Sequence, residues 1–357
     1  MNKPNIPILF VWNRMGDYHF ARTAQVEKLI GSDYVFTADL AASDNLYLWN
    51  TKNDNKHHIL LSKKNINKSD TLRRIINFIH VLKKHRIKAC GLAGYGRIEY
   101  LLMIIICKLA GIKTAVFTES WYENNRIISK AKAVFLKIFV NKYMASGIKA
   151  RNYLINSLNI HPDQIITGYS TVDNQHFSVA HSVKTKTLLC IARFSTEKNL
   201  LLLTEAFISS DLIHTHQLKI AGDGQLSHQL KTIAAQYPQI IIEPWTNYNQ
   251  LPALYKSASV FILPSKFEPW GLVVNEAMAA GLPVIVSDAC GCAPDLVSAD
   301  NGFVFNANSK ESLISVLNKV AQLPEEQLSG MGNHSLQIIR NFDTAVWAQN
   351  FLNLLNK

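Results

Sequence analysis

The sequence lacks several features that mark other classes of protein. Its longest charge-free apolar run near the middle, residues 101–107, ends at Lys108, whereas a helix that crosses a bilayer needs about 18 or more apolar residues. The five cysteines are odd in number and scattered through apolar stretches, which indicates reduced thiols and not a disulfide scaffold. Residues 1–5 lead directly into a strand-like run, without the basic-then-apolar pattern of a signal peptide. These absences predict a cytoplasmic protein with no membrane-spanning segment.

Motifs of several enzyme classes are also missing. No Asp-x-Asp pair occurs, although such a pair often holds a metal ion on a nucleotide diphosphate, and there is no P-loop, HExxH or GxSxG motif. No GxGxxG follows the first strand-like run, so a nicotinamide-dependent dehydrogenase is a weak alternative. Cys290-Gly291-Cys292 has the wrong spacing for a zinc pair and lacks a second half. The sequence therefore predicts no metal site and no cofactor.

What the chain does contain is an alternation of short strand-like runs and helical patterns over 357 residues, a length that fits two domains. The alternation stops in a polar stretch, residues 168–186, and restarts at the strand-like run Leu188–Ala192. This rhythm predicts an α/β protein of two doubly wound, Rossmann-like domains. We place them at residues 1–178 and 183–340, with a ligand crevice between them at the carboxyl ends of the strands.

Charge is divided unevenly along the chain. Residues 1–180 contain 25 Lys/Arg and 12 Asp/Glu, whereas residues 181–357 contain 12 Lys/Arg and 14 Asp/Glu. Lysines interrupt an aliphatic and aromatic stretch at residues 130–142, which is typical of a basic amphipathic helix that can lie on an anionic membrane surface. The alternative is an ordinary core-facing helix with solvated lysines. No nucleic-acid-binding module is recognisable, so nucleic acid is not an expected partner.

The most informative stretch is residues 264–286. A strand-like run ends at Pro264, a loop carries Glu268, and a helix starts near Gly271 and contains Glu276. The free backbone amides at the start of that helix, at Leu272 and Val273, suit a phosphate group. Carboxylates beside a bound phosphate are better suited to accept hydrogen bonds from sugar or ribose hydroxyls. The alternative for each glutamate is a simple interaction with the helix dipole.

Cationic side chains follow another predicted strand. Arg193 lies at its end and Lys198 lies at the start of the next helix, where a cation opposes the helix dipole unless an anion sits between them. The two could neutralise a diphosphate, or they could be solvated surface cations. The turn that contains Gly222 is glycine-rich, a weak signal when taken alone.

The first half of the chain offers three further candidates. Gly16 follows the first strand-like run and would permit close approach of a ligand to the backbone, and His19 starts the next helix. Glu119 lies at the carboxyl end of a strand-like run, which points toward the crevice. For His19 a purely local packing role is equally plausible from the sequence.

Taken together, these residues resemble the retaining glycosyltransferases of family 4, which have the GT-B fold. The resemblance covers nearly all of residues 186–306 and rests on Glu268 and Glu276, with seven residues between them, on Arg193 with Lys198, and on the Gly-Asp-Gly turn at Gly222. The first half is similar only in its alternating architecture and at Gly16. Many relatives have a double-glycine loop after the first strand and a histidine where this sequence has Glu119.

The resemblance implies roles for the residues of the second domain. Arg193 and Lys198 would hold the diphosphate in place of a metal ion, with help from the backbone amides of Leu272 and Val273. Glu276 would bind the ribose hydroxyls, and Glu268 the hydroxyls of the donor sugar. The loop that contains Trp245 would contact the base. The helix at residues 343–357 would cross back to the first domain, which would bind the acceptor.

The resemblance also implies a function. We expect a retaining hexosyltransferase that uses a nucleotide diphosphate sugar, acts on a glycan or lipid-linked acceptor in bacterial surface polysaccharide synthesis, and lies peripherally on the inner face of the cytoplasmic membrane. Glu119 or His19 would act at the acceptor. The alternatives are a nucleotide-sugar epimerase of the same fold, or a catalytically silent protein that binds glycan or lipid.

Overall fold

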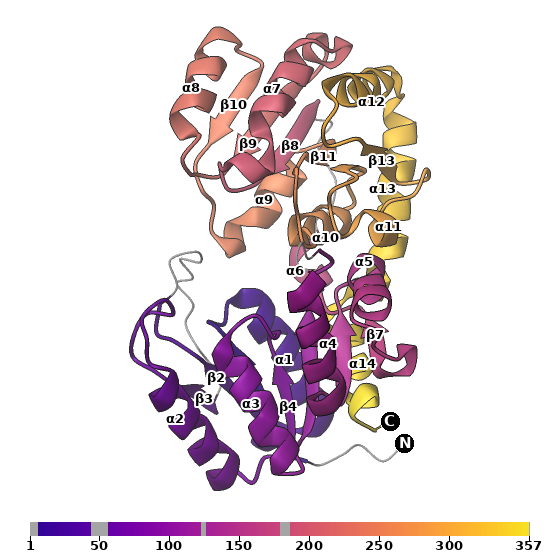
Figure 1. Cartoon of the computed structure of the whole chain (residues 1–357). Coiled ribbons are helices and arrows are strands. Elements are labelled where there is room, and N and C mark those ends of the chain that lie inside the picture. Colours follow the sequence, from indigo (N-terminus) through magenta and orange to yellow (C-terminus); the bar gives the residue numbers. More distant parts are fainter. Residues whose placement is uncertain (1–5, 44–55, 123–125, 179–185, 357) are drawn as a thin grey trace. The chain divides into compact units, whose positions relative to one another are not determined.

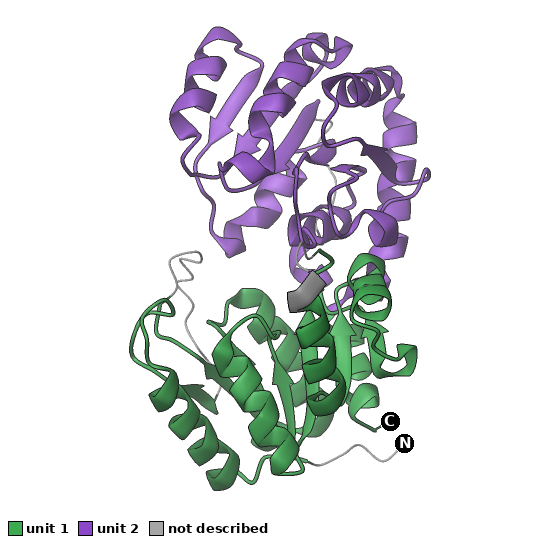
Figure 2. Ribbon diagram, viewed as in Figure 1, with its two compact units in different colours: residues 1–172, 344–357 green, residues 173–343 purple. Residues whose placement is uncertain are grey.

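The computed structural model describes residues 6–43, 56–122, 126–178 and 186–356 (Figure 1). The chain forms two compact units, which Figure 2 shows in separate colours. Unit 1 comprises residues 1–172 and 344–357, and unit 2 comprises residues 173–343. The chain thus enters unit 2 at Asp173, and its last helix belongs to unit 1.

Unit 1 is built on a parallel sheet of seven strands in the order β3-β2-β1-β4-β5-β6-β7. The strands are β1 (Ile8–Trp12), β2 (Val35–Asp39), β3 (His58–Leu60), β4 (Ala89–Leu92), β5 (Lys113–Thr118), β6 (Lys142–Ala145) and β7 (Ile165–Thr167). All five residues of β1 are buried, because the strand pairs with β2 on one side and β4 on the other and is covered on both faces. In this register Ile8 lies opposite both Val35 and Ala89.

Helices cover both faces of this sheet. They are α1 (Asp17–Ile30), α2 (Thr71–Lys84), α3 (Ile98–Leu109), α4 (Arg126–Phe139), α5 (Ile148–Asn152) and α14 (Thr344–Asn356). One core contains side chains of α2, α3, α4 and α5, and the opposite core contains those of α1 and α14. Helix α14 is held by aromatic packing, since the ring of Phe351 lies 4.8 Å from that of Phe10 on β1.

Unit 2 repeats the same plan with a parallel sheet of six strands in the order β10-β9-β8-β11-β12-β13. The strands are β8 (Thr187–Ile191), β9 (Gln217–Ala221), β10 (Ile240–Glu243), β11 (Val260–Leu263), β12 (Val284–Ser287) and β13 (Gly302–Phe305). The helices are α6 (Asn174–Phe177), α7 (Leu200–Ile208), α8 (Ser227–Gln236), α9 (Leu251–Lys256), α10 (Leu272–Ala279), α11 (Ala293–Leu296), α12 (Lys310–Gln322) and α13 (Glu325–Ile339).

The predicted class, two doubly wound α/β sheets, is confirmed. The apolar run at residues 200–208 predicts a helix, and α7 has the same bounds. The basic helix expected to reach residue 142 ends earlier, at Phe139, because β6 begins at Lys142. Within the part of the chain that the structure describes, no helix combines the length and apolar character that a membrane crossing requires.

Candidate functional site

The strand order of unit 2 reverses between β8 and β11, which pair with each other. The loops that follow these two strands leave the carboxyl edge of the sheet in opposite directions. Ligands of doubly wound proteins bind at such a switch point. The loop after β8 carries Arg193 and Lys198, and the loop after β11 carries Glu268, so the fold brings the two predicted clusters together.

The central contact is an ion pair between the Nζ of Lys198 and the Oε2 of Glu268. The two side chains are only 12% and 13% exposed, so the pair is largely shielded from solvent. The backbone ties the two loops together as well, since the amide of Lys266 donates to the carbonyl of Glu197 at 2.8 Å. A lysine in this position has further N–H donors with which it could bind an anion.

A third loop, after β12, fixes the backbone of Glu268. The Glu268 amide donates to the carbonyl of Ala289 at 3.3 Å, and the Gly291 amide donates to the carbonyl of Glu268 at 2.9 Å. The hydroxyl of Ser265 lies 3.4 Å from the same carboxylate oxygen that Lys198 contacts. Lys198 and Ser265 therefore hold the carboxylate while the loop after β12 holds the backbone of Glu268, so the position of this group does not depend on one flexible side chain alone.

Helix α10 begins beside this pair. Gly271 precedes it with a positive φ of 104°, and a Cβ at this position would lie 2.8 Å from the Cδ2 of Leu263. Only glycine fits this close turn without strain. The amides of Leu272 and Val273 open the helix and have no acceptor within it, so they can bind an anion.

Glu276 lies on α10 and is fully buried. Its Oε2 accepts a hydrogen bond of 2.6 Å from the hydroxyl of Tyr255, which is buried in α9. The sequence offered no signal for this partner, because Tyr255 comes from a separate short helix. A ribose would have to share this carboxylate with Tyr255.

Arg193 is the more exposed of the two predicted cations, with 52% of its side chain accessible. Its guanidinium lies 3.6 Å from Glu197, and that carboxylate also accepts a hydrogen bond of 2.6 Å from Ser195. The Ser195 hydroxyl is the main cause of a lowered pKa of Glu197, to which Arg193 adds. Arg193 is thus held only loosely and can turn toward a ligand.

The other two residues predicted to bind the sugar donor, Gly222 and Trp245, lie on neighbouring loops. Gly222 follows β9 and packs so tightly that a Cβ would lie 1.9 Å from the carbonyl oxygen of Ala192. Its role is therefore to let the loops after β8 and β9 approach each other. Trp245 follows β10 and is 56% exposed, so its ring is accessible to a stacking partner.

In unit 1, the side chain of His19 is hydrogen-bonded to the backbone of Gly16. The Nδ1 of His19 accepts a hydrogen bond of 3.0 Å from the amide of Gly16, which lies just before α1. Burial, with a smaller contribution from the charge of Arg22, holds the pKa of His19 well below its usual value. The ring is therefore neutral at physiological pH, with its proton on Nε2.

Glu119 follows β5, and its Oε1 accepts a hydrogen bond of 2.6 Å from the hydroxyl of Ser170. The neighbouring Thr171 is bound by Arg22, whose Nη2 donates to the Thr171 carbonyl at 2.8 Å. Arg22 is buried and also lies over the ring of Tyr169 at 4.8 Å. No sequence pattern indicates this role of Arg22, because an arginine within an ordinary helical pattern gives no sign that it will be buried.

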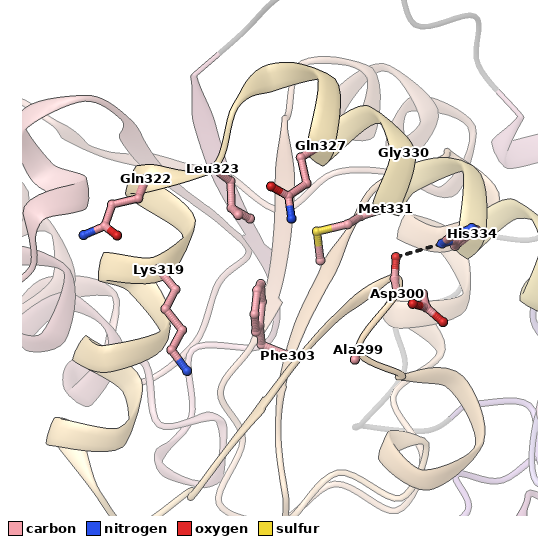
Figure 3. A pocket seen from close by; sticks show the side chains of 10 residues that line it. All are labelled: Ala299, Asp300, Phe303, Lys319, Gln322, Leu323, Gln327, Gly330, Met331 and His334. Carbon is pink, nitrogen blue, oxygen red and sulfur yellow. Dashed lines mark hydrogen bonds between the residues drawn. The ribbon is translucent and has the colours of Figure 1, made fainter.

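A cavity of about 640 Å³ lies elsewhere on unit 2, between α12, α13 and the start of β13 (Figure 3). Phe303 and Met331 line it, together with Asp300 and His334, where His334 Nδ1 lies 3.1 Å from the Asp300 carbonyl. It opens at the amino end of β13, the edge of the sheet opposite to Lys198 and Glu268. Among the described residues there is no group of three His, Cys, Asp or Glu that could hold a metal ion.

The family model of "Glycosyl transferases group 1" matches residues 171–334, which contain Lys198, Glu268 and α10. Unit 2 therefore carries a group 1 glycosyltransferase domain over nearly its whole length. The sequence-based identification of the family is confirmed, and the two parallel sheets of this glycosyltransferase form the GT-B fold.

Two glycosyltransferases and one solved structure are similar to this chain. An uncharacterized glycosyltransferase of Methanocaldococcus jannaschii is 28% identical over 54% of the chain, and the match spans 50% of that protein. The UDP-Gal:alpha-D-GlcNAc-diphosphoundecaprenol alpha-1,3-galactosyltransferase of Escherichia coli is 25% identical, with 72% of each protein covered. The structure of Anabaena HepE in complex with UDP has a TM-score of 0.77 at 13% identity, covering 98% of this chain and 100% of HepE. This last likeness concerns the fold.

Proposed function

We propose that this glycosyltransferase moves a hexose from a nucleoside diphosphate sugar to a glycan or lipid-linked acceptor, with retention at the anomeric carbon. The observation that carries the proposal is the shielded pair of Lys198 and Glu268 beside the first amides of α10. UDP is the nucleotide to test first, because it occurs in the names of the E. coli relative and the HepE complex.

The pair supplies the two kinds of group that this reaction needs. When the bond between the sugar carbon and the diphosphate breaks, negative charge develops on the leaving phosphate. Lys198, Arg193 and the opening amides of α10 can stabilise that charge without a metal ion. Glu268 accepts hydrogen bonds from the sugar hydroxyls, and its contact with Lys198 keeps both groups oriented.

We propose front-side attack by an acceptor hydroxyl. The new bond joins the acceptor oxygen to the anomeric carbon, the bond to the diphosphate oxygen breaks, and the acceptor proton passes to the leaving phosphate. The acceptor would bind to unit 1, where His19 and Glu119 are the proposed acceptor-side groups. A lipid-linked acceptor would place the protein on the cytoplasmic face of a membrane, in the synthesis of a bacterial surface polysaccharide.

The proposal can be tested by calorimetry with UDP, GDP, ADP, CDP and dTDP, each with and without EDTA. One nucleotide should bind, and EDTA should not change its affinity. Lys198→Met combined with Arg193→Met should weaken binding by tenfold or more. Lys266→Met is the matched control, since it removes an exposed lysine from the neighbouring loop, the one that carries Glu268. Absence of binding to every nucleotide would contradict the proposal and favour a catalytically silent protein.

The chemistry is tested separately with Glu268→Gln and a UDP-hexose. Nucleotide affinity should persist while turnover falls by a factor on the order of 100 or more, because the lost group acts on the sugar. If the wild-type protein consumed donor without any acceptor and released an isomeric UDP-sugar, an epimerase would be the correct reading.

A further inference from the structure

Helix α6 lies where the chain enters unit 2, and it is bonded to the residues where the chain leaves that unit. The carboxylate of Asp173 caps the helix by accepting a hydrogen bond of 3.3 Å from the amide of His176. The amide of Asn174 donates to the Oδ2 of Asp343 at 3.1 Å, and its Nδ2 donates to the carbonyl of Ile339 at 2.8 Å. The first helix of unit 2 is therefore fixed to the last residues of the same unit.

The histidine of α6 contacts the end of the loop that carries Trp245. This loop, residues 244–247, runs from β10 to a short helical turn that begins at Tyr248. The rings of His176 and Tyr248 are stacked, with centroids 4.2 Å apart and planes at 2° to each other, and the Nε2 of His176 lies 3.2 Å from the Tyr248 carbonyl oxygen. Since a carbonyl only accepts, His176 donates this hydrogen bond. His176 thus holds both the side chain and the backbone of the residue that ends the loop.

The phenylalanine of α6 contacts two tyrosines. Phe177 is fully buried, and its ring lies edge-to-face on those of Tyr248 and Tyr255, with centroids 5.5 and 5.9 Å away. The hydroxyl of Tyr255 binds Glu276 and also lies 3.3 Å from the carbonyl oxygen of Val273 at the start of α10. Phe177 therefore supports the tyrosine that holds the buried carboxylate of α10.

We propose that the two aromatic residues of α6 are positioning residues for the nucleotide. His176 orients the ring of Trp245 toward the base. Phe177 orients the carboxylate of Glu276 toward the ribose. Each acts through the tyrosine that it packs against, and neither touches the ligand. This role rests on the proposed function, because it assumes the nucleotide of the reaction and the base and ribose contacts expected of Trp245 and Glu276. The alternative is an aromatic cluster that only stabilises unit 2, which would change the free energy of unfolding but not the recognition of base and ribose.

Calorimetry with the full chain tests the role of His176, with UDP or with whichever of the five diphosphates the wild type binds. His176→Ala should weaken nucleotide binding about two- to tenfold, which is what one aromatic pair contributes. His176→Phe should recover affinity, because it keeps the stack. Pyrophosphate has no base and should bind to the wild type and to His176→Ala equally. His334→Ala is the matched control, since it also removes a contact of a histidine ring nitrogen with a carbonyl oxygen, 3.1 Å long, on α13.

A double-mutant cycle separates positioning from stabilisation. If His176 acts through Trp245, the double change His176→Ala with Trp245→Ala should weaken nucleotide binding no more than Trp245→Ala alone. Additive losses would overturn the role of His176. Equal losses of affinity for the nucleotide and for pyrophosphate would also overturn it, because they would not depend on the base.

Phe177→Leu tests the ribose side of the site. It should reduce the preference of the protein for the ribonucleotide over its 2′-deoxy form, because the carboxylate of Glu276 is displaced. Phe207→Leu is the control, since it changes another fully buried phenylalanine of unit 2 and should keep the preference. An unchanged preference in Phe177→Leu, with thermal unfolding lowered as in Phe207→Leu, would overturn the role of Phe177, as would the absence of any preference in the wild type.

Hydrogen exchange without ligand distinguishes this role from the proposed reaction. The amides of Gln250 and Leu251 donate to the carbonyl of Asn247 just after the Trp245 loop. Their exchange should quicken in His176→Ala, and that of the α10 amides should quicken in Phe177→Leu. Faster exchange in a protein that binds no nucleotide would support the contacts made by α6 and refute the proposed function. Nucleotide binding and exchange that neither variant alters would overturn the role of α6 and leave the proposed function standing.

Discussion

Gly271 provides a stringent test of the site's geometry. It joins the loop that carries Glu268 to helix α10, with φ and ψ of 104° and 66°. An added Cβ would lie 2.8 Å from Leu263 Cδ2 and 3.3 Å from Glu268 Cγ. Gly271→Ala should therefore strain the backbone and push the loop that carries Glu268 and the core side chain of β11 apart.

The magnitude follows from two contributions. A left-handed conformation costs an L-residue about 1–2 kcal/mol, and forcing an extra methyl group into a packed region costs about 1–3 kcal/mol. Together they lower the free energy of unfolding by about 2–5 kcal/mol. For a unit of 171 residues, at about 2–4 °C per kcal/mol, the midpoint of thermal unfolding should fall by about 4–20 °C. UDP affinity should fall as well, because the first amides of α10 are displaced.

Calorimetric unfolding scans measure the first effect, and Gly330→Ala is the control. Gly330 lies inside helix α13, and a Cβ there meets no atom within 4 Å. Replacing a glycine inside a helix by alanine stabilises by about 0.5–1 kcal/mol, so this variant should unfold at a slightly higher temperature. A Gly271→Ala protein that unfolds like the wild type and binds UDP normally would refute the geometry described for the start of α10.

Three further predictions concern single groups. Lys198→Met should lower the free energy of unfolding by more than the double change Lys198→Met with Glu268→Gln, since the single change leaves a shielded carboxylate unpaired. A double-mutant cycle by urea unfolding measures this coupling, and additive effects would contradict the ion pair. Because the pKa of His19 is held well below 6.5, the stabilisation from its neutral form is complete above pH 6.5 and is lost as the pH falls below that value. Relative to His19→Gln, the free energy of unfolding of the wild type should fall by up to about 1.4 kcal/mol per pH unit below pH 6.5. Parallel curves of stability against pH for the two proteins would contradict the lowered pKa of His19. Burial raises the pKa of the Cys190 and Cys290 thiols to about 12, so both should resist iodoacetamide at pH 8 in the native protein and react after unfolding. Peptide mass spectrometry measures the labelling, and fast labelling of the native protein would contradict the burial of the two thiols.

The pattern of strands and helices was predictable because it depends on local periodicity. The run Leu200–Ile208 reads as a helix from its own residues, and the sequence places Arg193 and Glu268 after strands without knowledge of the sheet. Which loops meet depends instead on strand order. The pairing of Lys198 with Glu268 joins residues 70 positions apart, and it requires β8 to lie next to β11. Neither loop contains a signal for that neighbour.

Burial of polar groups was the least predictable feature. Glu276 was expected to await a ribose, yet Tyr255 already donates to it from another helix. Glu119 was expected at the acceptor, and it holds Ser170 at 2.6 Å. In both cases the sequence shows the carboxylate but not the hydroxyl that reaches it, because the partner comes from an element whose position only the folded chain determines. The functional roles of both glutamates stay predictions.

The two units have net charges of opposite sign, so different interactions should control ligand binding in each unit. Unit 1 contains 26 Lys/Arg and 11 Asp/Glu, whereas unit 2 contains 11 Lys/Arg and 15 Asp/Glu. The net negative charge of unit 2 therefore repels a diphosphate. The affinity of unit 2 for a diphosphate must come from close, shielded hydrogen-bond donors such as Lys198 and the amides of α10. Salt screens exposed charges beyond a Debye length of about 10 Å at 0.1 M but acts weakly on shielded contacts. Raising NaCl from 0.05 to 0.5 M should thus change the calorimetric Kd for UDP by less than about threefold, while binding to anionic vesicles through unit 1 should fall by tenfold or more. An equally steep salt dependence of both would mean that the nucleotide is held by exposed surface charge, and that the shielded pair of Lys198 and Glu268 is not its binding site.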